Sequence, residues 1–511
     1  MNYVELFRAT LPETALEIAA LLVLVVDLGL LRKAEANVRR ATSVLLGVLG
    51  CGAALWTIAL PMQGGLQSGG DVLLSAGGST AVAQVGILAL TALTLFLLID
   101  LDFTRHAGEY VAVVLMSAAG GLLISAAQDL LVIFIGLELL SLGLYILTAF
   151  AKRSGKSAEA AMKYYLFGGM SAAFLLFGFS YLYGIAGSTN LHVILLATYG
   201  VQGVRAMPML YVALVMVVAG LGFKVAAVPF HLWAPDTYEG APAPAAAFIA
   251  SVSKVASFAL LISIGTAMLH VFGAARVVHL VMATGGSAPR TIGLAAQWSL
   301  ILAVLAGASM VLGNLAALAQ VSVRRLLAYS AIAHAGYMLL GLAYMTRSTR
   351  SEEAILFYVL TYGLTTIGAF GVVAAVEEAT GSDRLEAFLG LHKRSPMLAA
   401  VLLVLFLSLA GIPPLVGFWA KFNLFAAVLE AGTGAAAFGL VALAVAMSAV
   451  SLYYYLQVLK RAYVMPAVEA SAIAVPPITL AVLALVALAV LALGIFPDAL
   501  QSWIAGFYPG M

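Results

Sequence analysis

The sequence predicts an all-α integral membrane protein with about fourteen transmembrane helices. Of the 511 residues, 63% are hydrophobic and only 9% are charged, and the mean hydropathy is +1.08. Soluble globular chains carry roughly 25% charged residues. The apolar runs are continuous over about twenty residues, the length that a helix needs to cross a bilayer. Strands of a membrane barrel would instead give alternating segments of about ten residues, so we expect helices.

The apolar runs follow one another along the whole chain. We expect the spans to centre near Leu22, Leu49, Leu90, Leu115, Leu139, Phe174, Val215, Val255, Val304, Met338, Leu364, Leu403, Leu443 and Leu483. The first run lacks a basic segment before it and contains Glu13, Glu17 and Asp27, which predicts a retained helix rather than a cleaved signal. The single cysteine, Cys51, excludes an internal disulfide and a protein-bound iron–sulfur site.

Basic residues are distributed unevenly between alternate connections. One set of connections carries fifteen Lys and Arg residues, whereas the other carries six. Cytoplasmic connections of membrane proteins are enriched in Lys and Arg. We therefore expect the chain to lie in the cell inner membrane with the first set of connections on the cytoplasmic side. This places both termini on the non-cytoplasmic side.

A weak internal repeat divides the chain into units. Residues 157–166 align with residues 351–360 at an offset of 194, and these segments open spans six and eleven. Five spans is an odd number, so the two copies are expected to cross the membrane in opposite directions, as in inverted-repeat transporters. The predicted organisation is three N-terminal helices, a first repeat of helices 4–8, a second inverted repeat of helices 9–13, and helix 14, in residues 1–110, 111–270, 271–465 and 466–511 respectively.

Two spans are predicted to be broken. In span seven, Lys224 lies one turn before Pro229; in span twelve, Pro413 and Pro414 precede Lys421. Proline removes a backbone hydrogen bond and disturbs the preceding helical turn. A broken helix within lipid persists only where protein or water satisfies the freed backbone groups. Paired breaks of this kind in the two halves indicate a transport site.

Ionisable residues lie deep within these spans. Glu138 is about nine residues inside span five, and Lys224 and Lys254 flank the turn near Glu239 at similar depth, where they are expected to face each other. A charge at the membrane centre costs about 2.5–3.5 kcal/mol on insertion scales. Because burial disfavours the charged form, such a lysine can release a proton at neutral pH. A nearby Glu138 would keep Lys224 protonated, and their separation would act as a switch. With Lys421, these residues predict a proton-conducting path.

Other candidates have simpler alternatives. Lys163 lies close enough to a helix end for its side chain to extend to the interface, or it joins the path. His231 and His334 could relay protons near neutral pH, or they are packing residues. Arg324 and Arg325, at the start of span ten, are most simply topology anchors.

Several cofactor motifs are absent from the sequence. There is no GxxxxGK[ST] phosphate loop, no GxGxxG dinucleotide motif, no HExxH and no close cysteine or histidine cluster. We expect the chain to bind no nucleotide, haem or metal of its own. The energy for transport must then come from an ion gradient or from a partner.

Four long motifs resemble the antiporter-like subunits of respiratory complex I. They are residues 222–236, 239–244 with the following Ser253-Lys254, 325–337 and 411–422. The similarity covers roughly residues 100–465 and is to the subunit N group of the bacterial NADH:quinone oxidoreductases. A lysine rather than a glutamate at Lys421 argues against subunit M. The short segment after the last span argues against subunit L and related cation/proton antiporter subunits.

The resemblance implies a fourteen-helix proton-translocating subunit of the membrane arm. Its partners would be the other membrane-arm subunits within the lipid bilayer, with no nucleic acid. NADH, FMN, iron–sulfur clusters and quinone would belong to partner subunits, so the chain would hold no redox site although the whole complex is an oxidoreductase. The family's functional positions match Glu138, Lys224, Lys254 and Lys421. Glu138 and Lys224 would form the modulating pair, Lys254 the central relay and Lys421 the terminal exchange site.

Two alternatives stay open at this point. One is a subunit of a sodium/proton antiporter, and the other is a non-conducting membrane scaffold that keeps these charges as packed ion pairs. Residues 270–297 are also longer and more polar than the family leads us to expect, so the helix boundaries in this stretch are not fixed by the sequence.

Overall fold

The computed structural model describes residues 7–59, 73–75, 78–101, 103–199, 206–282, 292–348, 350–467 and 471–508. Within these residues, β-type backbone pairing is limited to three isolated bridges. The helices are α2 (Leu11–Val25), η1 (Val26–Leu30), α3 (Ala36–Ala59), α4 (Gly78–Phe96), α5 (Ala107–Ala126), α6 (Leu130–Thr148), α7 (Gly155–Ala186), α8 (Leu191–Tyr199), α9 (Ala206–Val225), α10 (Trp233–Gly240), α11 (Ala243–Ala250), α12 (Val252–Met282), α13 (Ile292–Leu318), α14 (Val323–Met345), α15 (Arg350–Thr380), η2 (Leu385–Phe388), α16 (Leu391–Arg394), α17 (Pro396–Ala410), α18 (Val416–Ala431), α19 (Ala435–Tyr463), α20 (Pro477–Ile495) and α21 (Pro497–Ala505).

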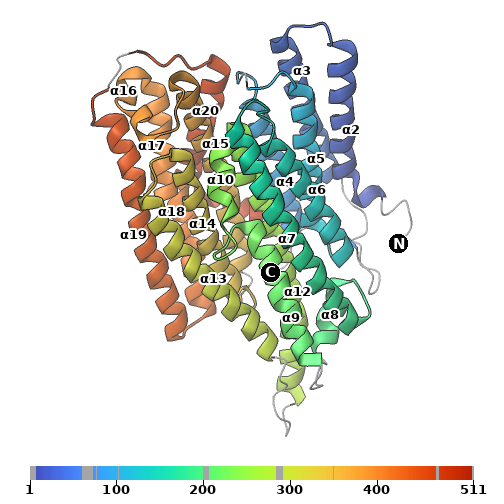
Figure 1. The fold of residues 1–511 in the computed structure, drawn as a ribbon. Coiled ribbons are helices and arrows are strands. Elements are labelled where there is room, and N and C mark those ends of the chain that lie inside the picture. The colour runs from blue at the N-terminus through green and yellow to red at the C-terminus, as the bar shows by residue number, and fades with distance from the viewer. Residues whose placement is uncertain are drawn as a thin grey trace.

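The long helices lie side by side in one bundle, with α2 and α3 at one edge and α19 at the other (Figure 1). In the described part of the chain, twelve helices are long and apolar enough to cross a membrane. The all-α membrane class is therefore confirmed. Two more crossings would come from α2 continued by the π-helical η1, and from α17 followed by α18, but the total of fourteen spans stays a prediction.

The breaks expected in spans seven and twelve are present. Helix α9 ends at Val225 and α10 begins at Trp233, while α17 ends at Ala410 and α18 begins at Val416. The prolines in these gaps lack the N–H group that would continue each helix. A third break, at Ser251 between α11 and α12, was not predicted. No proline or glycine near Ser251 indicates this break in the sequence.

The lysines of the two broken spans lie on opposite sides of their breaks. Lys224 is in the last turn of α9, before the gap, whereas Lys421 is in the second turn of α18, after the gap. The offset of 194 in the sequence repeat would carry Lys224 to position 418, a few residues before Lys421. The two lysines are nevertheless not in equivalent positions relative to the broken backbone.

Local features recur between the two halves at an almost constant spacing. Asp129 caps the start of α6 and Ser322 caps the start of α14, each by accepting a backbone N–H. Helices α7 and α15 both end on a glycine in the left-handed region, Gly187 and Gly381, where glycine is favoured. These pairs are separated by 193 and 194 residues. The recurrence supports the two-unit organisation, whose boundaries stay a prediction.

The stretch from 270 to 297 is helical at both of its ends. Helix α12 continues to Met282 and α13 begins at Ile292. Of the basic residues used to count charges, Arg205 and Arg290 lie outside the described residues. The side chain of Arg276 is also outside them.

Candidate proton-transfer site

Lys224 is held by a serine rather than by a carboxylate. Its Nζ donates a hydrogen bond of 2.5 Å to Oγ of Ser141 on α6, 83 residues earlier in the chain. Glu138 lies one helical turn before Ser141, half-buried, on the side of α6 that exposes Ile135 and Leu142. The structure thus places Glu138 and Lys224 near the same turn of α6, with Ser141 as the direct partner of the lysine.

Lys254 binds the open end of the broken helix α9. The side chain is only 2% exposed, and its Nζ donates to the carbonyl oxygen of Val225 at 3.1 Å and to that of Ala331 at 2.9 Å. Carbonyl groups at a helix C-terminus have no partner within the helix and carry a partial negative charge. Since Val225 is the last residue of α9, the break supplies Lys254 with an acceptor. Lys224 precedes Val225 in the chain, and whether the Lys224 and Lys254 side chains face each other stays a prediction.

Lys421 repeats this arrangement at the second broken helix. Its Nζ donates to the carbonyl oxygens of Leu409 at 3.1 Å and Ala410 at 2.9 Å, which close the C-terminus of α17. It also donates to Oγ of Ser448 on α19 at 2.8 Å. The side chain is 5% exposed. A half-helix C-terminus therefore supports a buried ammonium group in both units.

The three lysines share one electrostatic property. Every ion pair within 4.0 Å in the described residues involves other side chains, so the direct partners of Lys224, Lys254 and Lys421 are neutral hydroxyl and carbonyl groups. An adjacent carboxylate would fix the positive charge. Neutral dipoles stabilise it less strongly.

His334 lies beside the acceptor of Lys254. It is on α14, one turn after Ala331, and is 4% exposed. Its Nδ1 is 2.9 Å from the hydroxyl oxygen of Tyr358, and its Nε2 is 3.4 Å from that of Tyr455. The Tyr455 hydroxyl also pairs with Ser330. His334 is therefore joined to a buried group of hydroxyls rather than packed only against apolar side chains.

Tyr337 links His334 to Lys421. The His334 and Tyr337 rings have centroids 5.8 Å apart, and Nζ of Lys421 lies 5.5 Å from the Tyr337 ring centroid. The Tyr337 hydroxyl accepts a hydrogen bond from the amide of Asn314 at 3.1 Å. Lys254, His334, Tyr337 and Lys421 thus follow one another through the interior, from the end of the first half into the second.

His231 is placed differently. It lies in the gap between α9 and α10, is 7% exposed, and its Nδ1 has no hydrogen-bond partner among the described residues. The structure does not join it to His334. Whether His231 takes part in proton transfer stays a prediction.

Lys163 belongs to an ion-pair network at the end of the bundle. Its Nζ is 2.8 Å from Asp236 and 2.7 Å from Glu159, and Arg325 contacts Asp236 at 2.7 Å and Glu239 at 2.9 Å. Burial of Asp236 opposes its ionisation, but hydrogen bonds from Lys163 and Arg325 hold the pKa of this carboxyl below its usual value. The network ties α7, α10 and α14 together, and the Lys163 side chain is 41% exposed, unlike those of the deeply buried Lys254 and Lys421.

Arg324 fixes the turn between α10 and α11. Its guanidinium donates to the carbonyl oxygens of Glu239 at 2.9 Å and Ala241 at 2.7 Å. The side chain is buried. Arg324 and Arg325 therefore do more than anchor the topology, because they hold the α10–α11 segment that carries the chain from the α9 break toward Lys254.

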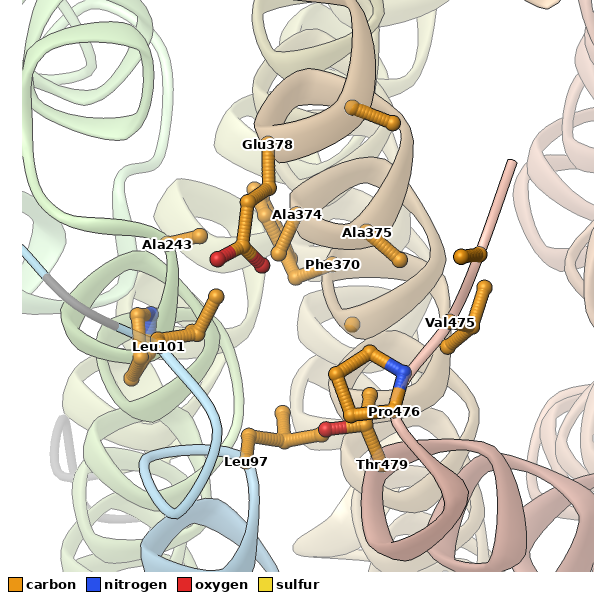
Figure 2. Close-up of a pocket in the computed structure, with 14 residues that line it drawn as sticks. Leu97, Leu101, Ala243, Phe370, Ala374, Ala375, Glu378, Val475, Pro476 and Thr479 are labelled. Atoms are coloured by element: carbon orange, nitrogen blue, oxygen red, sulfur yellow. The ribbon is translucent and has the colours of Figure 1, made fainter. Parts of the chain in front are cut away.

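A cavity opens at the end of the bundle where the basic connections gather. It has a volume of about 230 Å3, and Figure 2 shows the Glu378 carboxylate directed into it between Leu101 and Phe370, with Val475 and Thr479 across from them. A second cavity of about 340 Å3 shares part of this lining and extends to the α10–α11 turn and Arg324. Carboxylates and the ion-pair network thus meet at one surface.

Several contacting residues were not predicted from the sequence. Ser141 had a signal, because it lies three residues after Glu138 and shares a helix face with it. Ser448, Tyr358 and Tyr455 had none, since they are separated from their partners by 24–121 residues and polar residues of these types are common in helices. Among the described residues, no group of three or more His, Cys, Asp or Glu could hold a metal ion.

The fold and the buried lysines place this chain in the antiporter-like class of membrane proteins, and comparison with known proteins gives the same class. The family model described as NADH:quinone oxidoreductase/Mrp antiporter, TM, matches residues 127–289 and 287–448. The chain is 47% identical to NADH-quinone oxidoreductase subunit N 2 of Acidobacterium capsulatum over 99% of both chains. It is 37% identical to subunit N of an Anaeromyxobacter species, over 96% of this chain and 94% of that one. The chain belongs to the subunit N family of NADH-quinone oxidoreductases.

Solved structures agree with this family. A chain of respiratory complex I from Thermus thermophilus with bound aureothin is 33% identical, with a TM-score of 0.75 and coverage of 96% of this chain and 98% of that one. A chain of the Mrp complex from a Dietzia species also has a TM-score of 0.75, covering 99% and 98% of the two chains. At 22% identity, the Mrp likeness concerns the fold alone.

Proposed function

We propose that this chain is a proton-translocating subunit in the membrane arm of an NADH:quinone oxidoreductase. NADH oxidation and quinone reduction in partner subunits drive protons through its buried residues. The chain supplies no redox site, and NADH, FMN, iron–sulfur clusters and quinone belong to other subunits of the complex. It is a multi-pass protein of the bacterial plasma membrane, with both termini on the non-cytoplasmic side.

One observation carries the proposal. Three lysines lie in the interior of the bundle, and each ammonium group is held only by hydroxyl or carbonyl oxygens. A charged side chain at the centre of a membrane costs about 2.5–3.5 kcal/mol on insertion scales, and residues of this kind usually mark ion or proton pathways. A line of three groups that can exchange protons and have no carboxylate in direct contact fits proton transfer better than structural support.

The broken helix α9 supplies the coupling between the first two lysines. Lys224 and the Val225 carbonyl that binds Lys254 are consecutive residues. A change of charge near Glu138 that shifts the end of α9 therefore alters the surroundings of both ammonium groups. Glu138 and Lys224 act as the modulating pair, Lys254 as the central relay, and Lys421, reached through His334 and Tyr337, as the terminal exchange site.

Proton pumping by membranes carrying Lys224→Met tests this function. NADH-driven proton uptake into inverted membrane vesicles is measured, and assembly of the complex is checked on a native gel. Lys393→Met, an exposed lysine, is the matched control. We expect the Lys224 variant to assemble and lose most of its pumping or turnover, while the control pumps as the parent protein does.

The alternative functions give different outcomes. Unchanged pumping in assembled Lys224→Met complexes would overturn the role of this lysine and favour a non-conducting scaffold. Sodium-for-proton exchange by the isolated full chain in liposomes, without NADH or quinone, would instead favour a sodium/proton antiporter.

A further inference from the structure

Glu352 is a buried carboxylate that the proton path described above does not include. It is the third residue of α15 and is 2% exposed. Helix α15 begins at the end of the bundle opposite Arg324, Arg325 and the other basic connections. The charge bias predicts this end to be non-cytoplasmic, so Glu352 lies where protons would leave.

Two hydroxyl groups from distant parts of the chain hold the carboxylate. The Tyr508 hydroxyl donates to Oε1 at 3.0 Å, and the Thr266 hydroxyl on α12 donates to Oε2 at 3.2 Å. Burial and the nearby Glu352 carboxylate raise the pKa of Tyr508, which keeps its hydroxyl protonated as a donor. Both oxygens of Glu352 are therefore oriented within the structure.

The segment after α21, residues 506–508, covers this carboxylate and is called the C-terminal segment below. Tyr508 follows α21, which packs against α15. The carbonyl oxygen of Phe507 lies near the start of α4, at 4.0 Å from the position that a side chain on Gly78 would take. The segment thus lies over the ends of α4 and α15, and Tyr508 ties it to Glu352. Its displacement would open the carboxylate to water.

Helix α15 also connects Glu352 with His334. Tyr358, which pairs with Nδ1 of His334, is six residues further along the same helix, a rise of about 9 Å. Six residues also turn Tyr358 about 120° around the helix from Glu352, so a proton that passes between them needs a bridging group. Next to Glu352, the Ser351 hydroxyl is fully buried and has no hydrogen-bond partner among the described residues. Such a hydroxyl is a suitable partner for a bridging water.

We propose that Glu352 is the proton-release group of this chain and that the C-terminal segment, held by Tyr508, is the lid over it. A proton that Lys421 has exchanged with His334 by way of Tyr337 passes from the His334–Tyr358 pair, through water near Ser351, to the Glu352 carboxylate. It leaves to the non-cytoplasmic side when the segment moves. This inference rests on the proposed function, because it requires that protons reach His334.

The test compares three carboxylate variants in the complete complex in membrane vesicles. Glu352→Gln removes the titrating group and keeps the size, Glu352→Asp keeps the group, and Glu353→Gln makes the same change one residue further on. Assembly is checked on native gels, and pumping is measured per NADH oxidised. We expect Glu352→Gln to assemble and lose most of its pumping, Glu352→Asp to recover at least half of it, and Glu353→Gln to pump as the parent protein does.

Lys254→Met separates failure of this inference from failure of the proposed function. Loss of pumping in Lys254→Met with normal pumping in assembled Glu352→Gln would overturn the release site and leave the proposed function intact. Normal pumping in both would overturn both. Tyr508→Phe loosens the lid but leaves the carboxylate, so we expect it to retain more pumping than Glu352→Gln. Equal loss in Tyr508→Phe, Glu352→Gln and Glu352→Asp would mean that the contact is structural only.

Discussion

The ammonium group of Lys254 closes the open end of α9 by donating to the carbonyl oxygen of Val225 at 3.1 Å. Lys421 caps the end of α17 in the same way, by donating to the carbonyl oxygen of Ala410 at 2.9 Å. Each broken span thus presents backbone acceptors to a lysine from another helix or from beyond the break. The breaks that interrupt the helices are the features that make buried ammonium groups tolerable.

Lys254→Arg separates the hydrogen-bonding role of this lysine from its proton-transfer role. Arginine keeps donors for the carbonyl oxygens of Val225 and Ala331, but it stays protonated in proteins. We therefore expect assembled complexes that have lost most of their pumping. Lys254→Met would also leave two buried carbonyl groups without this donor, at about 1–3 kcal/mol each, so it should assemble less well than Lys254→Arg on native gels. Full pumping by Lys254→Arg would contradict a relay role.

Ser141→Ala removes the acceptor that holds Lys224. A hydrogen bond to a charged group contributes about 1.5–3 kcal/mol, so the ammonium group loses much of its local stabilisation. We expect slower NADH-driven pumping at unchanged assembly, and recovery in Ser141→Thr, which keeps the hydroxyl. Ser180→Ala, at an exposed position of α7, is the control. Pumping at the parent rate in Ser141→Ala would show that Lys224 needs no partner at this position.

Tyr358→Phe removes the hydroxyl that pairs with Nδ1 of His334 and leaves the ring in place. We expect the rate of proton pumping to fall while assembly is unchanged, because His334 loses a partner in a region with no bulk water. Tyr453→Phe, on the exposed side of α19, should pump as the parent protein does. If the two variants behave alike, His334 is a packing residue, as one interpretation of the sequence allows.

Gly417→Ala tests the geometry of the second break. A side chain at Gly417 would overlap the carbonyl oxygen of Ser408, which is backbone and cannot move aside easily. Overpacking of this kind costs about 1–3 kcal/mol, and it would also disturb the end of α17 that Lys421 binds. We expect a lower content of assembled complex and a lower thermal inactivation temperature. Gly439→Ala, where the new side chain meets open space, should match or exceed the parent stability.

The sequence by itself determined the class of protein and the identity of the buried charges. Lipid cannot satisfy backbone groups or charges, so any feature that breaks or charges an apolar run can be recognised from the sequence. These features are Pro229, Pro413, Glu138, Lys224, Lys254 and Lys421. For the same reason, the two predicted breaks are found where the prolines stand.

The tertiary structure alone decided what each charge contacts. Lys224 contacts Ser141, which is 83 residues away in the sequence, and Lys254 contacts the carbonyl oxygen of Ala331, which is 77 residues away. Every residue has a backbone carbonyl, so no sequence pattern marks the ones that become acceptors. The break at Ser251 has the same cause, since packing rather than a proline interrupts the helix there. The sequence shows which charged residues lie in apolar spans, where lipid makes them costly. Only the packing of the helices shows which dipoles stabilise them.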